Sequence, residues 1–443
     1  MENNLSNQSL DVQGLINENE FSVFQKIIFF MCFLIVLLDG FDTAAIGYIA
    51  PSLVKEWGVT KAALAPVLSA ALFGLAAGAM LSGPIADRIG RKLMLIFSVS
   101  IFGVGCLFSS YAPDLTTLTM LRFVTGIGLG AAMPNAVTMM SEFSPDQRKS
   151  MITSAMFTGF PLGAALGGFL AAWVIPQWGW RSVLMLGGIA PLLLLLALIF
   201  LMPESIRFMV TKKASAKKIL NVLSKISSSV PQTSSFHLKE LNAASDGRTG
   251  LKVVLSSQYL VGSLMLWITY FMGLVIFYAL INWMPILFKE AGLSPANATL
   301  ISALFPLGGV GAIFFGWLMD RLNANKVIAA GYALTAVAIF AIGLTVSNTA
   351  ALVVIVFLAG AIMNTSQSSM PALAAGYYPT SGRVTGVSWM LGVGRFGGIA
   401  GSFLVAALAS RQFEFADIFA IVAIPAVIAS LALIVKMLVD RKA

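Results

Sequence analysis

Long apolar runs alternate with short polar breaks along most of the chain. A helix needs about 20 predominantly apolar residues to cross the hydrocarbon core of a bilayer. Twelve stretches reach that length, so the pattern predicts an all-α membrane protein with twelve transmembrane helices. The predicted spans cover residues 24–49, 62–84, 93–112, 115–141, 151–175, 182–202, 258–285, 298–319, 326–346, 350–373, 384–409 and 415–438.

The longest polar break covers residues 203–254 and separates six predicted spans from six. Apolar residues recur at helical spacing within it, and they predict a surface helix over residues 214–242 that lies along the membrane face. These apolar residues are Ile219, Leu220, Leu223 and Ile226, and the break also holds nine cations: Arg207, Lys212, Lys213, Lys217, Lys218, Lys225, Lys239, Arg248 and Lys252.

The distribution of lysine and arginine predicts how the spans are oriented. Cytoplasmic loops of membrane proteins carry an excess of these residues. With the N-terminus inside, the inner segments hold 21 of the 28 cations and the outer loops hold five, so we expect both termini and the long break to be cytoplasmic. The outer cations are Lys55, Lys61, Arg181, Lys289 and Arg411, and the remaining two, Arg122 and Arg395, lie within spans.

Composition narrows the class of protein further. Hydrophobic residues make up 58% of the chain and charged residues 11%, a balance that excludes a soluble domain and a disordered chain. The net charge of +9 follows from the basic loops, and no basic stripe with interleaved aromatics suggests a nucleic-acid partner. Cys32 and Cys106 lie in apolar runs, where we expect small core residues and no disulfide. With one histidine, His237, and no P-loop, we expect no metal, no cofactor and no catalytic centre.

A loop motif occurs twice, at the same place in each half of the chain. The loop after the second span contains Gly83, Asp87, Arg88, Gly90 and Arg91 in the pattern Gly-x-x-x-Asp-Arg-x-Gly-Arg-Lys. The loop after the eighth span repeats the first part of the pattern, ending in Asp320 and Arg321. Two copies in register indicate duplicated halves.

On these motifs the chain resembles the major facilitator superfamily over all twelve spans. The resemblance implies two six-helix bundles that rock around a central cavity, with the loop motif tethering the cytoplasmic side in the outward-open state, and we expect a monomer. Glu142, at the inner end of the fourth span, is a candidate partner for Arg91. The expected organisation is an N-terminal tail (1–23), a first bundle (24–202), a linker (203–254), a second bundle (255–438) and a C-terminal tail (439–443).

Four charges lie deep within the predicted spans: Asp39, Asp42, Arg122 and Arg395. Intramembrane charges usually face a cavity or a partner. At 1.5 Å per residue, both acids and Arg122 fall at one level of the first bundle, and Arg395 falls near the midplane of the second. One interpretation is mutual neutralisation. The other is a substrate carboxylate on Arg395 or Arg122 with the coupling proton on Asp39 and Asp42, and the two interpretations are compatible.

The sequence Leu38-Asp39-Gly40-Phe41-Asp42 resembles the D-G-x-D motif of the aromatic acid:proton symporters, a subfamily of the superfamily. Stretches around Arg122 and Arg395 agree with it. The resemblance implies proton-coupled uptake of benzoate-like, hydroxybenzoate-like or muconate-like acids across the bacterial inner membrane. Glu142 joins the two aspartates as a candidate proton-coupling residue.

Polar and aromatic residues in the spans are candidates to line the cavity. Amides in hydrocarbon need a partner, and rings suit an aromatic substrate. The candidates are Tyr278, Asn282, Trp283, Phe305, Asn364, Gln367, Trp389 and Phe396. A rival interpretation remains open: Pro203-Glu204-Ser205 resembles the sugar-porter ending, so the chain could carry a sugar, nicotinate or a dicarboxylate, although intramembrane arginines favour an anion.

Overall fold

A computed structural model describes residues 10–227, 236–237, 251–311, 322–378 and 380–440. The elements are β1 (Leu10–Asp11), α1 (Val12–Glu18), α2 (Val23–Trp57), α3 (Lys61–Ile89), α4 (Arg91–Ser109), α5 (Leu115–Glu142), α6 (Lys149–Phe157), α7 (Gly159–Trp178), α8 (Arg181–Leu201), α9 (Ile206–Thr211), α10 (Ala216–Leu223), β2 (Phe236–His237), α11 (Leu251–Val254), α12 (Leu260–Glu290), α13 (Pro295–Leu307), η2 (Gly308–Gly311), α15 (Ala324–Leu344), α16 (Thr349–Tyr377), α17 (Thr380–Ser410) and α18 (Phe415–Asp440).

Eleven segments of the described chain are long and apolar enough to cross a membrane, and they coincide with eleven of the twelve predicted spans. The fifth span combines α6 and α7, which meet at Thr158. The eighth begins with α13 and η2, and its remainder, residues 312–321, lies outside the described residues. The chain is thus a multi-pass membrane protein, as the apolar pattern predicts.

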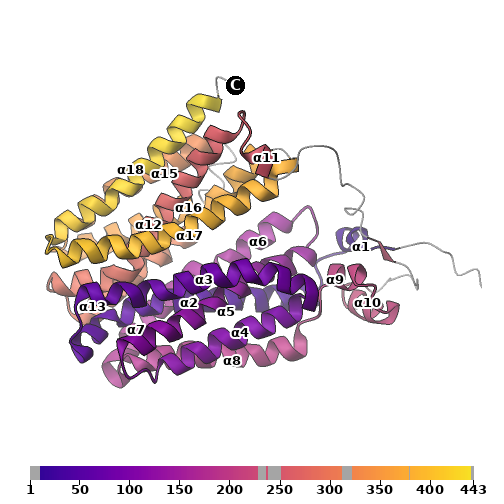
Figure 1. The fold of residues 1–443 in the computed structure, drawn as a ribbon, viewed down its shortest axis with the longest axis horizontal. Helices are drawn as coiled ribbons and strands as arrows, with labels where there is room; N and C mark the ends of the chain where they lie inside the picture. Colours follow the sequence, from indigo (N-terminus) through magenta and orange to yellow (C-terminus); the bar gives the residue numbers. More distant parts are fainter. Residues whose placement is uncertain (1–9, 228–235, 238–250, 312–321, 379, 441–443) are drawn as a thin grey trace, which may run out of the picture.

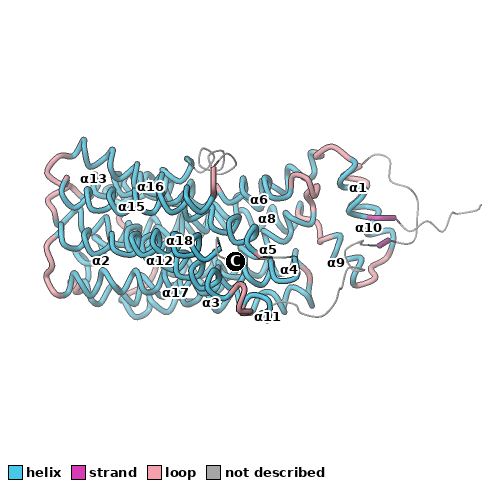
Figure 2. Tube along the Cα trace, turned by 90° about the horizontal axis from the view of Figure 1, so that it is seen from above, coloured by secondary structure: helices cyan, strands magenta, loops and turns pink. Residues whose placement is uncertain are grey.

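The helices form two bundles that meet at one end and diverge at the other (Figure 1). The first bundle contains α2 to α8, and the second contains α12 to α18. The short elements α1, α9 and α10 stand beyond the ends of the long helices, as Figure 2 shows. We call this the linker end and the opposite end, where the bundles meet, the far end.

Glycines let helices within a bundle approach closely, as small-residue spacing predicts. A Cβ atom on Gly74 or Gly78 of α3 would lie 2.0 or 2.1 Å from a backbone oxygen of α5. Gly126 and Gly130 of α5 are packed equally closely against the backbone of α3. Alanine would not fit at these positions without moving a helix.

The N-terminal tail and the linker form one small folded unit at the linker end. Ile16 of α1 is 1% exposed and packs with Ile219 and Leu223 of α10. Strand β1 pairs in parallel with β2 of the linker, so two residues of each segment depart from a purely helical fold.

The predicted helix over 214–242 is wrong in length, because α10 ends at Leu223. Ser224 and Lys225 begin turns there, and Ile226 folds back into the core that Leu223 enters. Serine competes with the backbone for hydrogen bonds, and this favours turns over a helix interior.

Candidate functional site

A buried ion pair joins α2 and α5 in the first bundle. Nη1 of Arg122 lies 2.8 Å from Oδ1 of Asp42, and neither side chain has any exposed area. The predicted common depth of the two charges is therefore confirmed. A buried pair of this kind needs good geometry and additional hydrogen bonds, because desolvation of both ions is costly.

Three further side chains supply hydrogen bonds to the pair. The thiol of Cys106 donates to Oδ1 of Asp42 at 3.0 Å, with the carbonyl of Leu184 at 3.3 Å as a second acceptor. Nη2 of Arg122 donates to the hydroxyl oxygens of Ser109 at 3.4 Å and of Thr125 at 3.3 Å. In the described part of the chain, Oδ2 of the aspartate and Nε of the arginine remain buried without a partner.

The other two intramembrane charges, Asp39 on α2 and Arg395 on α17, belong to different bundles. Asp39, 2% exposed, accepts a hydrogen bond from Thr43 at 3.3 Å and lies within electrostatic range of Arg395. Arg395 on α17 is partly buried and, among the described residues, makes no hydrogen bond or ion pair. Within the described part of the chain, only one half of the predicted neutralisation is thus a direct contact, and the Arg395 guanidinium keeps its donors uncommitted.

Two tyrosines of α12 pack against α17 next to this arginine, at Gly394 and Gly398. Tyr278, predicted as a lining residue, and Tyr270, which sequence reasoning missed, both lie within electrostatic range of Arg395. The missed tyrosine lies eight residues before the predicted one on α12, and this spacing places both on one helix face. Gln367 donates to the Tyr270 carbonyl at 3.3 Å and accepts from the hydroxyl of Tyr332, also missed, at 2.5 Å.

Most of the remaining predicted lining residues are engaged with their neighbours. Asn282 donates to Ser402 at 2.9 Å, and its Oδ1 is buried without a partner among the described residues. Asn364 donates to the carbonyl of Phe305 at 2.9 Å. Trp389 stacks on Trp267 at 5.6 Å, about 9 Å along α17 from the arginine. Trp283 donates to the carbonyl of Ser402, and Phe396 is largely exposed.

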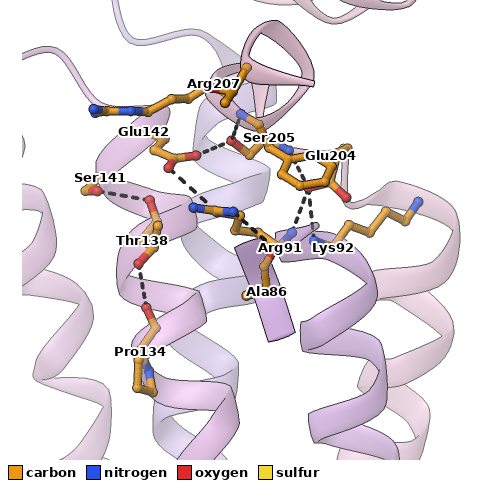
Figure 3. Close-up of polar contacts among 12 residues, drawn as sticks. Ala86, Arg91, Lys92, Pro134, Thr138, Ser141, Glu142, Glu204, Ser205 and Arg207 are labelled. Carbon is orange, nitrogen blue, oxygen red and sulfur yellow. Dashed lines mark hydrogen bonds and ion pairs between the residues drawn. The ribbon is translucent and has the colours of Figure 1, made fainter. Parts of the chain in front are cut away.

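A second polar cluster lies at the linker end, where α3 turns into α4 (Figure 3). Oε1 of Glu204 accepts from the backbone N–H groups of Arg91 at 2.9 Å, Lys92 at 3.2 Å and Ser205 at 2.8 Å. Its charge therefore sits at the N-terminus of α4, where the helix dipole favours an anion. In the sequence, Glu204 was considered only as part of a stretch that resembles sugar porters. Its role in capping α4 was not predicted.

Glu142 belongs to this second cluster rather than to the aspartates. Its Oε1 lies 3.9 Å from Nε of Arg91, so the predicted partnership is confirmed as a long ion pair, and its Oε2 accepts from the hydroxyl of Ser205. Figure 3 shows the carboxylate at the end of α5, with Arg207 alongside. A direct hydrogen-bond route from Glu142 to Asp42 is not among the contacts of the described residues.

The loop motif contributes its second glycine, Gly90, and its second arginine, Arg91, to this cluster. Gly90 adopts a φ of +101°, a backbone conformation that favours glycine, and a Cβ atom there would also displace the Glu204 carboxylate, whose Oε2 would lie 2.2 Å away. Gly83 and Arg88 are exposed at the end of α3. The predictions that concern the Asp87 side chain, Asp320 and Arg321 lie outside the described residues.

Comparison with known proteins decides the family. The model of the Major Facilitator Superfamily matches residues 32–313 and again residues 266–443. The chain belongs to the major facilitator superfamily. Two overlapping matches in one chain agree with the duplicated halves that the loop motif indicates.

Relatives within this family are similar over nearly their whole length. The 4-hydroxybenzoate transporter PcaK of Pseudomonas putida is 47% identical over 98% of this chain and 97% of its own. A gallate transporter of Pseudomonas putida is 44% identical over 96% and 94%. A partially occluded, inward-open structure of the xylose transporter XylE from E. coli has a TM-score of 0.73 at 16% identity, covering 93% of this chain and 97% of that one, which is a likeness of fold alone.

Proposed function

We propose that this protein takes up aromatic carboxylates together with protons across the bacterial inner membrane, by alternating access and as a monomer. The observation that carries the proposal is the arginine near the bundle interface, Arg395, whose donors are uncommitted among the described residues. The relatives named for 4-hydroxybenzoate and gallate, both aromatic carboxylates, support the substrate class. With both termini inside the cell, the linker end faces the cytoplasm, which agrees with its many cations.

The substrate carboxylate binds Arg395 rather than Arg122. Arg122 is already held by Asp42 at 2.8 Å and has no exposed surface, so a second anion would have to displace a buried ion pair. Arg395 is partly buried and offers the planar fork of donors that matches a carboxylate. Tyr270 and Tyr278 beside it provide rings and hydroxyls suited to a hydroxylated aromatic ring.

Proton coupling follows from the position of Asp39. Asp39 is buried on α2 and lies within electrostatic range of the positive charge of Arg395. A bound carboxylate compensates the same positive charge, so Asp39 then binds a proton more readily, and by reciprocity a protonated Asp39 favours the anion. The proton also removes the cost of moving an anion against an inside-negative potential, about 2.3 kcal/mol per charge per 100 mV. Asp42, which is ion-paired with Arg122, is the second candidate proton-coupling carboxylate of the first bundle.

The test is uptake of labelled 4-hydroxybenzoate into proteoliposomes with an acid exterior. Accumulation should require the proton gradient, and unlabelled gallate and benzoate should compete. Replacing Arg395 by Gln should raise KM about ten- to a hundred-fold, because hydrogen bonds to a charged group contribute roughly 1.5–3 kcal/mol. Asp39→Asn should still allow the substrate to move down its own concentration gradient. It should abolish accumulation of the substrate against that gradient.

The matched control is Arg411→Gln, which removes a cation from an exposed position beyond the far end of α17. It should leave KM and accumulation unchanged. Accumulation that persists without a proton gradient, or that no aromatic acid inhibits, would refute the proposal.

A further inference from the structure

At the far end, α2 and α12 touch backbone to backbone at one glycine. A Cβ atom on Gly47 would lie 2.4 Å from the carbonyl oxygen of Ile281 and 2.9 Å from Cα of Asn282. Both obstructing atoms belong to the backbone of the second bundle, so they cannot move out of the way by a side-chain rotation. Any side chain at position 47 therefore requires the two bundles to separate there.

Two polar contacts cross between the bundles at the same end. Nζ of Lys61, at the start of α3, lies 2.7 Å from Oε2 of Glu290, the last residue of α12. Nζ of Lys289 donates to the carbonyl of Pro51, on α2, at 3.4 Å. These contacts lie one and more helical turns beyond Gly47, toward the end of the molecule.

The far end is closed in this structure, whereas the bundles diverge at the linker end (Figure 1). Gly47 lies five residues beyond Asp42 on α2, about 7.5 Å farther out. Closure at Gly47 thus separates the charged residues of the site from the far face.

We propose that Gly47 and the Lys61–Glu290 pair form the gate that closes the far side during transport, and that they stabilise the far-closed state specifically. In the alternative state the bundles part at this end. The backbone of α12 then no longer lies against Gly47, so a side chain is tolerated there. The gate rests on the alternating access of the proposed function, but not on which solute is carried. Gly47 acts by allowing close approach, and the ion pair acts by adding an attraction that exists in one state only.

The population of the two states can be measured by the distance between spin labels on exposed sites of the two bundles. Lys55→Cys and Asn297→Cys place one label on each bundle at the far end, and both native residues are exposed. Cys32 and Cys106 are fully buried and do not compete for label. In the absence of substrate, Gly47→Val should abolish the short-distance population and shift the distribution of label-to-label distances to longer values.

The matched control is Gly163→Val, because a Cβ atom there would meet the Leu37 carbonyl oxygen at 1.8 Å within the first bundle. That clash is present in both states, so the control should lower the thermal unfolding midpoint. The ratio of far-closed to far-open molecules within the folded fraction should stay unchanged. Gly47→Val should fold near the parental midpoint. A Gly47 variant that fails to fold, or that keeps the short distance, would overturn the proposal.

Charge reversal tests the ion pair. Lys61→Glu or Glu290→Lys alone should reduce the far-closed population about two- to five-fold, the range expected when a half-exposed pair becomes repulsive. The double reversal should restore it. Additive effects of the two substitutions, with no rescue in the double variant, would remove the pair from the gate. Because these readings need no substrate, their failure is distinguishable from a wrong substrate assignment.

Discussion

The carboxylate of Glu204 holds the start of α4 in place, and its removal offers a quantitative test. In Glu204→Ala, the N–H groups of Arg91 and Lys92 lose their charged acceptor, and so does the N–H of Ser205. Loss of a helix cap typically costs about 0.5–2 kcal/mol, and each hydrogen bond to a charged group is worth roughly 1.5–3 kcal/mol. Since Glu204 is only partly buried, water replaces part of these bonds, and we expect a loss of about 2 kcal/mol.

The two native cysteines supply the assay. Both are completely buried, so a thiol-reactive fluorescent dye reports unfolding in detergent without added labels. A loss of about 2 kcal/mol in a bundle of this size corresponds to a midpoint lowered by roughly 4–8 °C. Glu204→Gln keeps the oxygen acceptor but not the charge and should fall between alanine and the parent.

Glu20→Ala is the control, because it removes an exposed acid at the same end of the molecule that caps no helix in the described structure. An unfolding midpoint for Glu204→Ala that equals the control would show that the carboxylate does not stabilise α4.

Three further outcomes are expected. Asp42→Asn or Arg122→Gln alone should destabilise the protein by about 3–5 kcal/mol by leaving a buried charge unpaired, and the double variant should lose less than either single one in the same dye assay. Ile16→Asp should undock α1, since that side chain is 1% exposed, and protease should then cleave the N-terminal tail faster while the bundles stay intact. Cys106→Ser, which keeps a donor to Asp42, should retain more uptake than Cys106→Val, and equal uptake would show that the thiol hydrogen bond is dispensable.

The spans could be predicted from the sequence because lipid imposes a simple rule of length and apolarity. Eleven predicted spans match segments of the described chain, and the intramembrane position of Arg122 and Asp42 at one depth followed from helix rise alone. The helical extent of the linker was predicted less accurately. Its amphipathic pattern continued past Leu223, whereas turn-forming serines and a strand pairing with the distant N-terminus decided where α10 ends.

The candidate site was predictable in its charges but not in their partners. Periodicity placed Arg395 in a span, yet which acid it faces depends on how two bundles pack. The amides show the limit of residue type as a guide: Asn364 was a reasonable lining candidate, and the structure commits its donor to the backbone of Phe305 beside a helix break. Glu204 escaped notice because its role is fixed by three N–H groups more than a hundred residues away or adjacent in the chain, which no local pattern reveals.

The pairing of β1 with β2 also has a consequence for the order of biosynthesis. Leu10 emerges from the ribosome about 226 residues before its partner Phe236. At roughly 5–20 residues per second, the N-terminal strand waits on the order of 10–45 s, during which all helices of the first bundle are delivered to the membrane. The strand can therefore pair only after that bundle has been synthesised, so its docking marks a completed first half of the chain.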